Sequence, residues 1–134
     1  MAEDCIFCAI VAGDASAEII HQDEHTVAFL DINPWARGHS LVVPRRHSKN
    51  LYDIDEDDLE HTMIAAKRLA KQAKEALGCE DVMLLNSSEP AAWQVVPHFH
   101  VHVIPRYADD SFRFPQPERA DPDEIAKVAS ELSG

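Results

Sequence analysis

Three histidines, His98, His100 and His102, alternate with apolar residues in the segment 95–106. If this segment is an extended strand, alternate side chains share a face, so the spacing places the three imidazoles in one row. Such a row can ligate a metal, or it can present one ring as a nucleophile to a phosphorus or acyl centre. A strand with ordinary polar residues on its solvent face is the alternative, and the repetition of one titratable residue type disfavours it.

Cys5 and Cys8 form a Cys-x-x-Cys pair near the start of the chain, which has 3 cysteines in total. In a cytosolic protein such a pair favours metal or redox chemistry over a structural disulfide. Two reduced, buried cysteines without a metal are the alternative. Cys79 follows an expected helix, and we interpret it as a packing residue.

Helices and strands that could position these residues follow from the hydrophobic pattern and the turn residues. A long helix is expected from residue 55 or 56 to 77, because apolar residues recur at three- and four-residue steps and Gly78 follows. A short helix at 5–11, closed by Gly13, and a terminal helix at 123–132, with Asp121 as N-cap, are also expected. Strands are expected at 19–22, 26–30, 39–43, 82–85 and along the histidine segment. Antiparallel strands with one long helix predict an α+β domain.

The length of 134 residues fits a single domain with one core. We expect residues 1–107 to form that domain and residues 108–134, which contain three prolines and alternating charges, to form a tail with a short helix. The net charge of -12 disfavours nucleic acid polymers and anionic membranes as partners, while a small nucleotide stays possible. No apolar run approaches the ~18 residues that span a bilayer, and acidic residues precede the longest run, so we expect a cytoplasmic protein.

The histidine segment resembles the signature of the histidine triad (HIT) superfamily, in which three histidines alternate with apolar residues. Segments 5–8, 28–34 and 38–47, followed by Asn86 and Gln94, match further family motifs in the family's order. The resemblance is strongest to the Hint branch of small dimeric nucleotide hydrolases and transferases. It implies a HIT domain at 1–107 with a five-stranded antiparallel sheet, one long helix and short terminal helices. It also implies a homodimer and a purine nucleotide as substrate.

The resemblance assigns catalytic roles to three residues. His100 would be the nucleophile that attacks the α-phosphorus of a nucleoside phosphoramidate or related nucleotide and forms a nucleotidyl-histidine intermediate. A neutral imidazole suits this role, provided that its other nitrogen donates its proton to a fixed acceptor. His102 would donate to the phosphoryl oxygens, and Gln94 would face the leaving group, although a loop-capping amide is the alternative for Gln94.

Further positions would bind the nucleotide. Asp31 follows an expected strand, and its carboxylate could accept hydrogen bonds from both hydroxyls of a ribose. The resemblance adds Phe7, Phe29 and Ile32 as walls of the base pocket, with core packing as the alternative for the two phenylalanines. It also adds Asn86 as a contact on the phosphate side, and it makes His39 a structural residue.

The resemblance also completes a metal site. In zinc-bearing members the ligands are the Cys-x-x-Cys pair, the histidine after the Pro-basic-basic run and the first histidine of the triad. The corresponding residues here would form a Cys₂His₂ set that suits a structural zinc ion with no open coordination position: Cys5, Cys8, His47 and His98.

The loop before the triad departs from the family pattern. Residues 87–93 contain no glycine, and Trp93 stands directly before Gln94, where the family usually has glycine. Val95 replaces a hydroxyl residue. These changes concern the leaving group more than the triad, so a dinucleoside polyphosphate hydrolase and a nucleotide-binding scaffold protein with little catalysis are kept as alternative functions.

Overall fold

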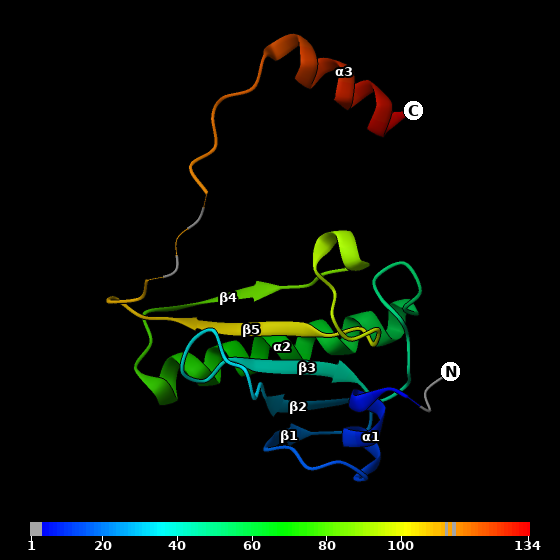
Figure 1. Cartoon of the computed structure of the whole chain (residues 1–134), viewed down its shortest axis with the longest axis vertical. Coiled ribbons are helices and arrows are strands. Elements are labelled where there is room, and N and C mark those ends of the chain that lie inside the picture. Colours follow the sequence, from blue (N-terminus) through cyan, green and yellow to red (C-terminus); the bar gives the residue numbers. More distant parts are fainter. Residues whose placement is uncertain (1–3, 112, 114) are drawn as a thin grey trace.

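Five antiparallel strands form one sheet in the order β1-β2-β3-β5-β4 (Figure 1). The computed structural model describes residues 4–111, 113 and 115–134. The strands are β1 (Ile19–Gln22), β2 (Thr26–Leu30), β3 (Ser40–Pro44), β4 (Asp81–Leu85) and β5 (Val101–Arg106). Together with the helices they give the α+β fold, with a five-stranded antiparallel sheet and one long helix, that the sequence predicts.

The long helix α2 (Glu56–Leu77) covers one face of the sheet (Figure 1). Asp55 caps its start by accepting a hydrogen bond from the backbone N–H of Asp57, and Gly78 ends it in a left-handed conformation with φ 69°. Its buried stripe, which includes Ala66 and Leu69, packs against buried side chains of the sheet, and together they form one hydrophobic cluster. These bounds agree with the predicted helix.

The short helix α1 (Ile6–Ala12) packs on the opposite face of the sheet. Phe7 is buried there against Phe29, with ring centroids 5.4 Å apart, while Ala28 belongs to the cluster under α2. Adjacent residues of β2 therefore face different helices, as the two-residue period of a strand requires. The central strands β2 and β3 are buried on both faces, which makes them a rigid base for side chains on the α1 face.

The histidine segment differs from the prediction of a strand throughout 95–106. The strand β5 begins only at Val101, so His98 and His100 precede it in an irregular segment. The register pairs Val42 with Val101, which would bring Phe99 opposite Pro44. Pro44 has no N–H for the ladder, and the backbone N–H of Phe99 donates to the Ser48 carbonyl instead, at 2.8 Å. Phe99 and Val101 still point toward α2, so the predicted alternation of faces is retained.

The turn before β3 depends on Gly38, which has φ +89°. This conformation favours glycine, and a Cβ at this position would overlap the Leu77 side chain at the end of α2. The close approach fixes the backbone that leads into β3 and, with it, the position of the adjacent His39.

The helix α3 (Pro122–Ser133) lies apart from the sheet (Figure 1). Asp121 caps it by accepting from the N–H of Asp123, and Pro122 occupies its first turn, as predicted. The division of the chain after residue 107 stays a prediction. Among the described residues, no helix combines the length and the apolar character needed to cross a bilayer.

Candidate active site and metal centre

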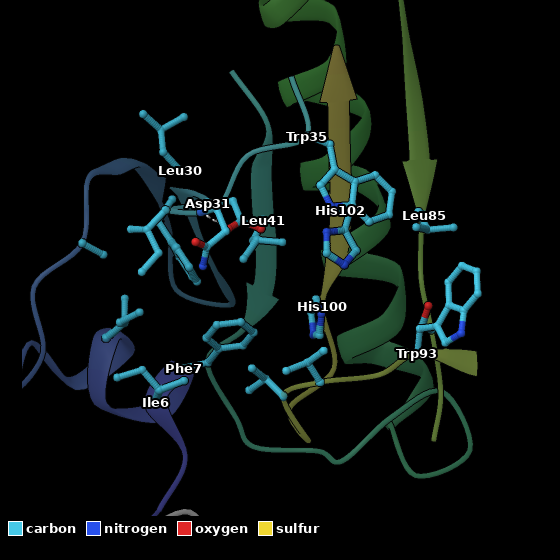
Figure 2. A pocket seen from close by; sticks show the side chains of 18 of the residues that line it. Ile6, Phe7, Leu30, Asp31, Trp35, Leu41, Leu85, Trp93, His100 and His102 are labelled. Carbon is cyan, nitrogen blue, oxygen red and sulfur yellow. Dashed lines mark hydrogen bonds between the residues drawn. The ribbon is translucent and has the colours of Figure 1, made fainter. Parts of the chain in front are cut away.

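A pocket of about 440 Å³ opens on the α1 face of the sheet, above β3 and β5 (Figure 2). This volume is in the range of small-molecule sites. Most of its lining is apolar, and two imidazoles reach it from the triad. The predicted site residues that the structure brings together along this pocket are Phe7, Phe29, Asp31, Ile32, His100 and His102.

His100 is 5% exposed and lies against the edge of Phe7, with ring centroids 5.1 Å apart. Its Nδ1 lies 2.7 Å from the carbonyl oxygen of His98. Because a carbonyl can only accept, Nδ1 carries the proton, and Nε2 of the neutral ring keeps its lone pair. Burial lowers the pKa of His100, so the neutral form prevails at neutral pH. The ring therefore has the protonation state of a nucleophile.

His102 is held in the opposite tautomer by a chain of hydrogen bonds. The backbone N–H of Trp35 donates to Nδ1 of His39 at 3.0 Å, which leaves the proton of neutral His39 on Nε2. That Nε2 lies 2.9 Å from Nδ1 of His102 and donates to it. The proton of His102 is consequently on Nε2. Burial, together with His100 and His39, lowers the pKa of His102 to about 4.

His39 is thus more than a packing residue, because it sets which nitrogen of His102 can donate. It is 1% exposed, and burial lowers its pKa. Its Nε2 also lies 3.6 Å from a carboxylate oxygen of Asp31. Ligand atoms of Asp31, His39 and His102 lie within 4.8 Å of one another, but both nitrogens of His39 are used by the hydrogen-bond chain, so we interpret this group as a positioning network. Sequence reasoning had no means to find it, since residues 39 and 102 are far apart in the chain.

Asp31 stands where β2 ends, at one end of the pocket (Figure 2). One carboxylate oxygen accepts from the N–H of Asn33 at 2.8 Å, which fixes the side chain in a turn. Its side chain is 18% exposed, so the carboxylate is available to a ligand in the pocket. Ile32 is exposed beside it, and Phe29 is buried below.

Gln94 and Asn86 do not line the pocket. The Gln94 side chain accepts from the backbone N–H of Glu89 and donates to the carbonyls of Lys49 and Val96. In this structure its amide therefore caps the loop. Asn86 donates to the carbonyl of His100 at 2.8 Å, so it fixes the backbone of the triad from the neighbouring strand end.

Two tryptophans also line the pocket, although the sequence alone does not indicate a binding role for them. Trp35 lies beside His102, and Trp93 lies beyond His100 (Figure 2). The rings of Trp35 and His102 are 6.1 Å apart and nearly parallel. The only sequence signal for Trp93 was its departure from the family's glycine.

The four predicted metal ligands converge next to this pocket. Their sulfur and nitrogen atoms lie within 4.8 Å of one another. Nδ1 of His98 is 3.3 Å from Sγ of Cys5, 3.4 Å from Sγ of Cys8 and 3.3 Å from Nδ1 of His47. Around a tetrahedral zinc ion, bonds of ~2.3 Å to sulfur and ~2.0 Å to nitrogen place S and N ligands ~3.5 Å apart and two nitrogens ~3.3 Å apart. The cluster fits this geometry.

The protonation of His98 also suits a metal ligand. Its Nε2 donates to the Pro44 carbonyl at 2.9 Å, so the neutral ring directs the lone pair of Nδ1 toward the cysteines. Burial lowers the pKa of His98 to about 4. Burial and the neighbouring Cys5 raise the pKa of the Cys8 thiol to about 11, and a cation between the two sulfurs would offset this effect.

A family model described as HIT domain matches residues 12–109 of the chain. An uncharacterized HIT-like protein of Methanocaldococcus jannaschii is 38% identical over 125 residues, which are 92% of this chain and 96% of that protein. A Zn-bound histidine triad family protein of Mycobacterium smegmatis is similar in structure, with a TM-score of 0.81 and 34% identity over 98% of this chain and 99% of that chain. A histidine triad nucleotide-binding protein of Candida albicans has a TM-score of 0.84 and 29% identity over 97% of this chain and 95% of that chain.

Proposed function

The chain belongs to the HIT domain family, and on that premise we propose that it is a nucleotide hydrolase or transferase that acts through His100. The observation that carries the proposal is the state of His100: its Nδ1 proton is held by the His98 carbonyl, and its ring borders a pocket large enough for a nucleoside monophosphate. The name of the Candida albicans relative, a nucleotide-binding protein, supports the choice of ligand. The finer placement in the Hint branch stays a prediction.

In the proposed reaction the lone pair of His100 Nε2 attacks the α-phosphorus of a nucleoside phosphoramidate. The phosphorus–nitrogen bond of the substrate breaks, and the amine leaves after it takes up a proton from water. Water then attacks the phosphorus of the nucleotidyl-histidine, the bond to Nε2 breaks, and the nucleoside monophosphate is released. His102 donates from Nε2 to the phosphoryl oxygens, whose negative charge grows in the transition state.

The other predicted residues hold the substrate or the triad. Asp31 accepts hydrogen bonds from the ribose hydroxyls, and Phe7, Phe29 and Ile32 form an apolar slot for a purine. The side chain of Asn86 positions His100 by donating a hydrogen bond to the backbone carbonyl of His100. A contact between Asn86 and the phosphate would require the loss of that hydrogen bond. Gln94 would reach the leaving group only after its three bonds within the loop are rearranged.

We further propose that Cys5, Cys8, His47 and His98 hold a structural zinc ion. Such an ion links α1 to the segment that precedes β5, and it supplies stability rather than chemistry because all four positions are filled by protein ligands. The Zn-bound relative of Mycobacterium smegmatis supports this choice of metal. The homodimer and the cytoplasmic location stay predictions.

Turnover of adenosine 5′-phosphoramidate tests the function directly. The wild-type protein is expected to release AMP, and a denaturing quench at alkaline pH during turnover is expected to trap AMP bound to the protein by a linkage that is stable in base and labile in acid. Diadenosine polyphosphates, tested at the same concentration, should be turned over more slowly. Faster cleavage of these compounds would favour the polyphosphate hydrolase, and AMP binding without turnover of either would favour the scaffold protein.

Variants of His39 test the hydrogen-bond chain. His39→Ala removes the donor to His102 and is expected to lower kcat by roughly 10- to 100-fold with a smaller effect on KM, as for other residues that orient an active-site ligand. His39→Gln places an amide N–H near the position of Nε2 and should restore much of kcat. If the wild-type protein and the two variants have equal melting temperatures but unequal kcat, the effect of His39 on kcat comes from positioning and not from stability. Equal kcat in all three proteins would contradict the role of His39 in orienting His102.

A further inference from the structure

The cysteine pair and the pocket share the first turn of α1. Cys5 caps this helix, because its sulfur accepts a hydrogen bond from the backbone N–H of Cys8 at 3.3 Å. The two sulfurs lie within 4.8 Å of each other. The two residues between the cysteines, Ile6 and Phe7, both line the pocket (Figure 2). A change in the distance between the sulfurs therefore changes one wall of the pocket.

Phe7 is the residue through which this turn contacts the triad. Its side chain is 6% exposed, and its ring lies edge-on to the rings of His98 and His100, with centroids 6.0 Å and 5.1 Å away. On another side the ring packs against Phe29. Close-packed side chains transmit a displacement to their neighbours because there is little free space to absorb it. A shift of Phe7 is therefore felt at His100 and at the apolar slot together.

The three cysteines of the chain are free thiols that differ in their surroundings. Cys8 is half-buried, whereas Cys5 and Cys79 are buried, so Cys8 is the most accessible of the three. The sulfur of Cys79 contacts the Ala73 carbonyl at the end of α2 and lies outside the cluster. Among the described residues, Cys5 is thus the one cysteine with which Cys8 can form an intramolecular disulfide.

We propose that Cys5 and Cys8 are a site of reversible oxidation, at which a peroxide forms a disulfide that disables the pocket; this rests on the proposed function, in which the pocket holds a nucleotide. The sulfur of Cys8 attacks one peroxide oxygen, the O–O bond breaks, and water and a sulfenic acid form. The sulfur of Cys5 then attacks the sulfur of Cys8, the S–O bond breaks, and a second water leaves. The sulfurs lose two electrons to the peroxide, and the two protons come from the thiols or, for metal-bound thiolates, from solvent.

The disulfide changes the site in two ways. Its sulfurs carry no thiolate charge, so only the imidazoles of His47 and His98 remain as ligands and the zinc ion is released. Two bonded sulfurs also lie closer together than two ligands of one metal ion, so the turn that carries Ile6 and Phe7 tightens. The ring of His100 then loses its packing partner, and the apolar slot changes shape.

Peroxide treatment of the reduced protein, purified without chelator, tests this assignment. Mass spectrometry should find a chain lighter by two hydrogen atoms with Cys5 linked to Cys8, and thiols counted in denaturant should fall from three per chain to one. A zinc-binding dye should detect the released ion. Calorimetry should show that AMP binds roughly 10-fold more weakly, and kcat for adenosine 5′-phosphoramidate should fall by roughly 100-fold, as for ångström-scale displacements in other active sites. Dithiothreitol followed by zinc should restore both, which separates the disulfide from oxidised methionine and sulfinic acid.

Two variants serve as matched controls. Cys79→Ala keeps the pair and should lose AMP affinity on peroxide treatment as the wild-type protein does, with recovery in dithiothreitol. Cys8→Ala cannot form the disulfide, so peroxide should leave its AMP affinity at whatever value the untreated variant has. A comparison of treated and untreated samples of each protein isolates the effect of oxidation from the effect of the substitution.

The outcomes separate this inference from the proposed function. Turnover by the reduced wild-type protein reports the function before any peroxide is added, and its absence would reject the function and the inference together. With turnover present, three results would overturn the inference alone: no Cys5–Cys8 disulfide, a disulfide without a change in AMP affinity, or a loss of affinity that Cys8→Ala shares. The first two are measured on the wild-type protein, so misfolding of a variant does not prevent a decision.

Discussion

Turnover should fall by about 10⁴-fold or more when His100 is replaced by asparagine, while AMP binding persists. The side-chain amide of asparagine can place an N–H near the position of Nδ1 and keep the hydrogen bond to the His98 carbonyl, which is 2.7 Å long in the native ring. It has no counterpart of Nε2, so the covalent intermediate cannot form. The measurement is steady-state release of AMP together with calorimetric titration of AMP.

The His100→Ala variant provides a matched control for this design. It removes both nitrogens and leaves a space beside Phe7, so any loss of binding or of melting temperature beyond that of His100→Asn reports the positioning hydrogen bond and the packing. Turnover in His100→Asn at the wild-type rate would show that another group performs the chemistry. Equal, negligible turnover in wild type and both variants would leave a nucleotide-binding protein.

The second large effect is expected at the proposed zinc site. Purified without chelator, the wild-type protein should contain close to one zinc ion per chain, whereas Cys8→Ala should contain almost none. The melting temperature of the variant is expected to fall by roughly 10 °C or more, because binding free energy at a closed structural site contributes directly to folding. Elemental analysis and thermal unfolding measure the two effects on the same sample.

Cys79→Ala is the control for that experiment. Cys79 is also buried, but its sulfur contacts the Ala73 carbonyl at the end of α2 and lies outside the cluster. This variant should keep its zinc, so a loss specific to Cys8 would identify the site. If the wild-type protein contained no zinc, the proposed metal site would be contradicted, and the alternative of two reduced, buried cysteines without a metal would be favoured.

The parts of the fold that local patterns determine were predicted well. The caps Asp55 and Gly78 and the periodic apolar stripe between them define α2. The short Asp23–His25 connection predicted the β1–β2 hairpin, in which the side chain of Asp23 accepts from the backbone N–H groups of His25 and Thr26. The start of β5 was predicted too early. Its ladder of hydrogen bonds with β3 ends at Pro44, which is far from β5 in sequence, and only the strand register shows that Pro44 stands there.

The site shows the same division between local and distant information. The alternate spacing of the triad predicted that His100 and His102 would share a face, and both border the pocket. The tautomers of these rings depend on His39 and on carbonyl groups, whose positions follow from strand pairing. The orientation of Gln94 depends on contacts with residues 49 and 89, so residue type and spacing alone left two interpretations open.

One residue of the triad serves two centres at once. Nδ1 of His98 lies among the sulfur and nitrogen atoms of the proposed zinc site, and the backbone carbonyl oxygen of His98 accepts the hydrogen bond from Nδ1 of His100, the proposed nucleophile. A disturbance of the ligand cluster that shifts this peptide group would weaken the bond that keeps His100 in its reactive tautomer. Chelating agents would accordingly act as slow inactivators as well as destabilisers, and the age and handling of a preparation would influence its measured specific activity.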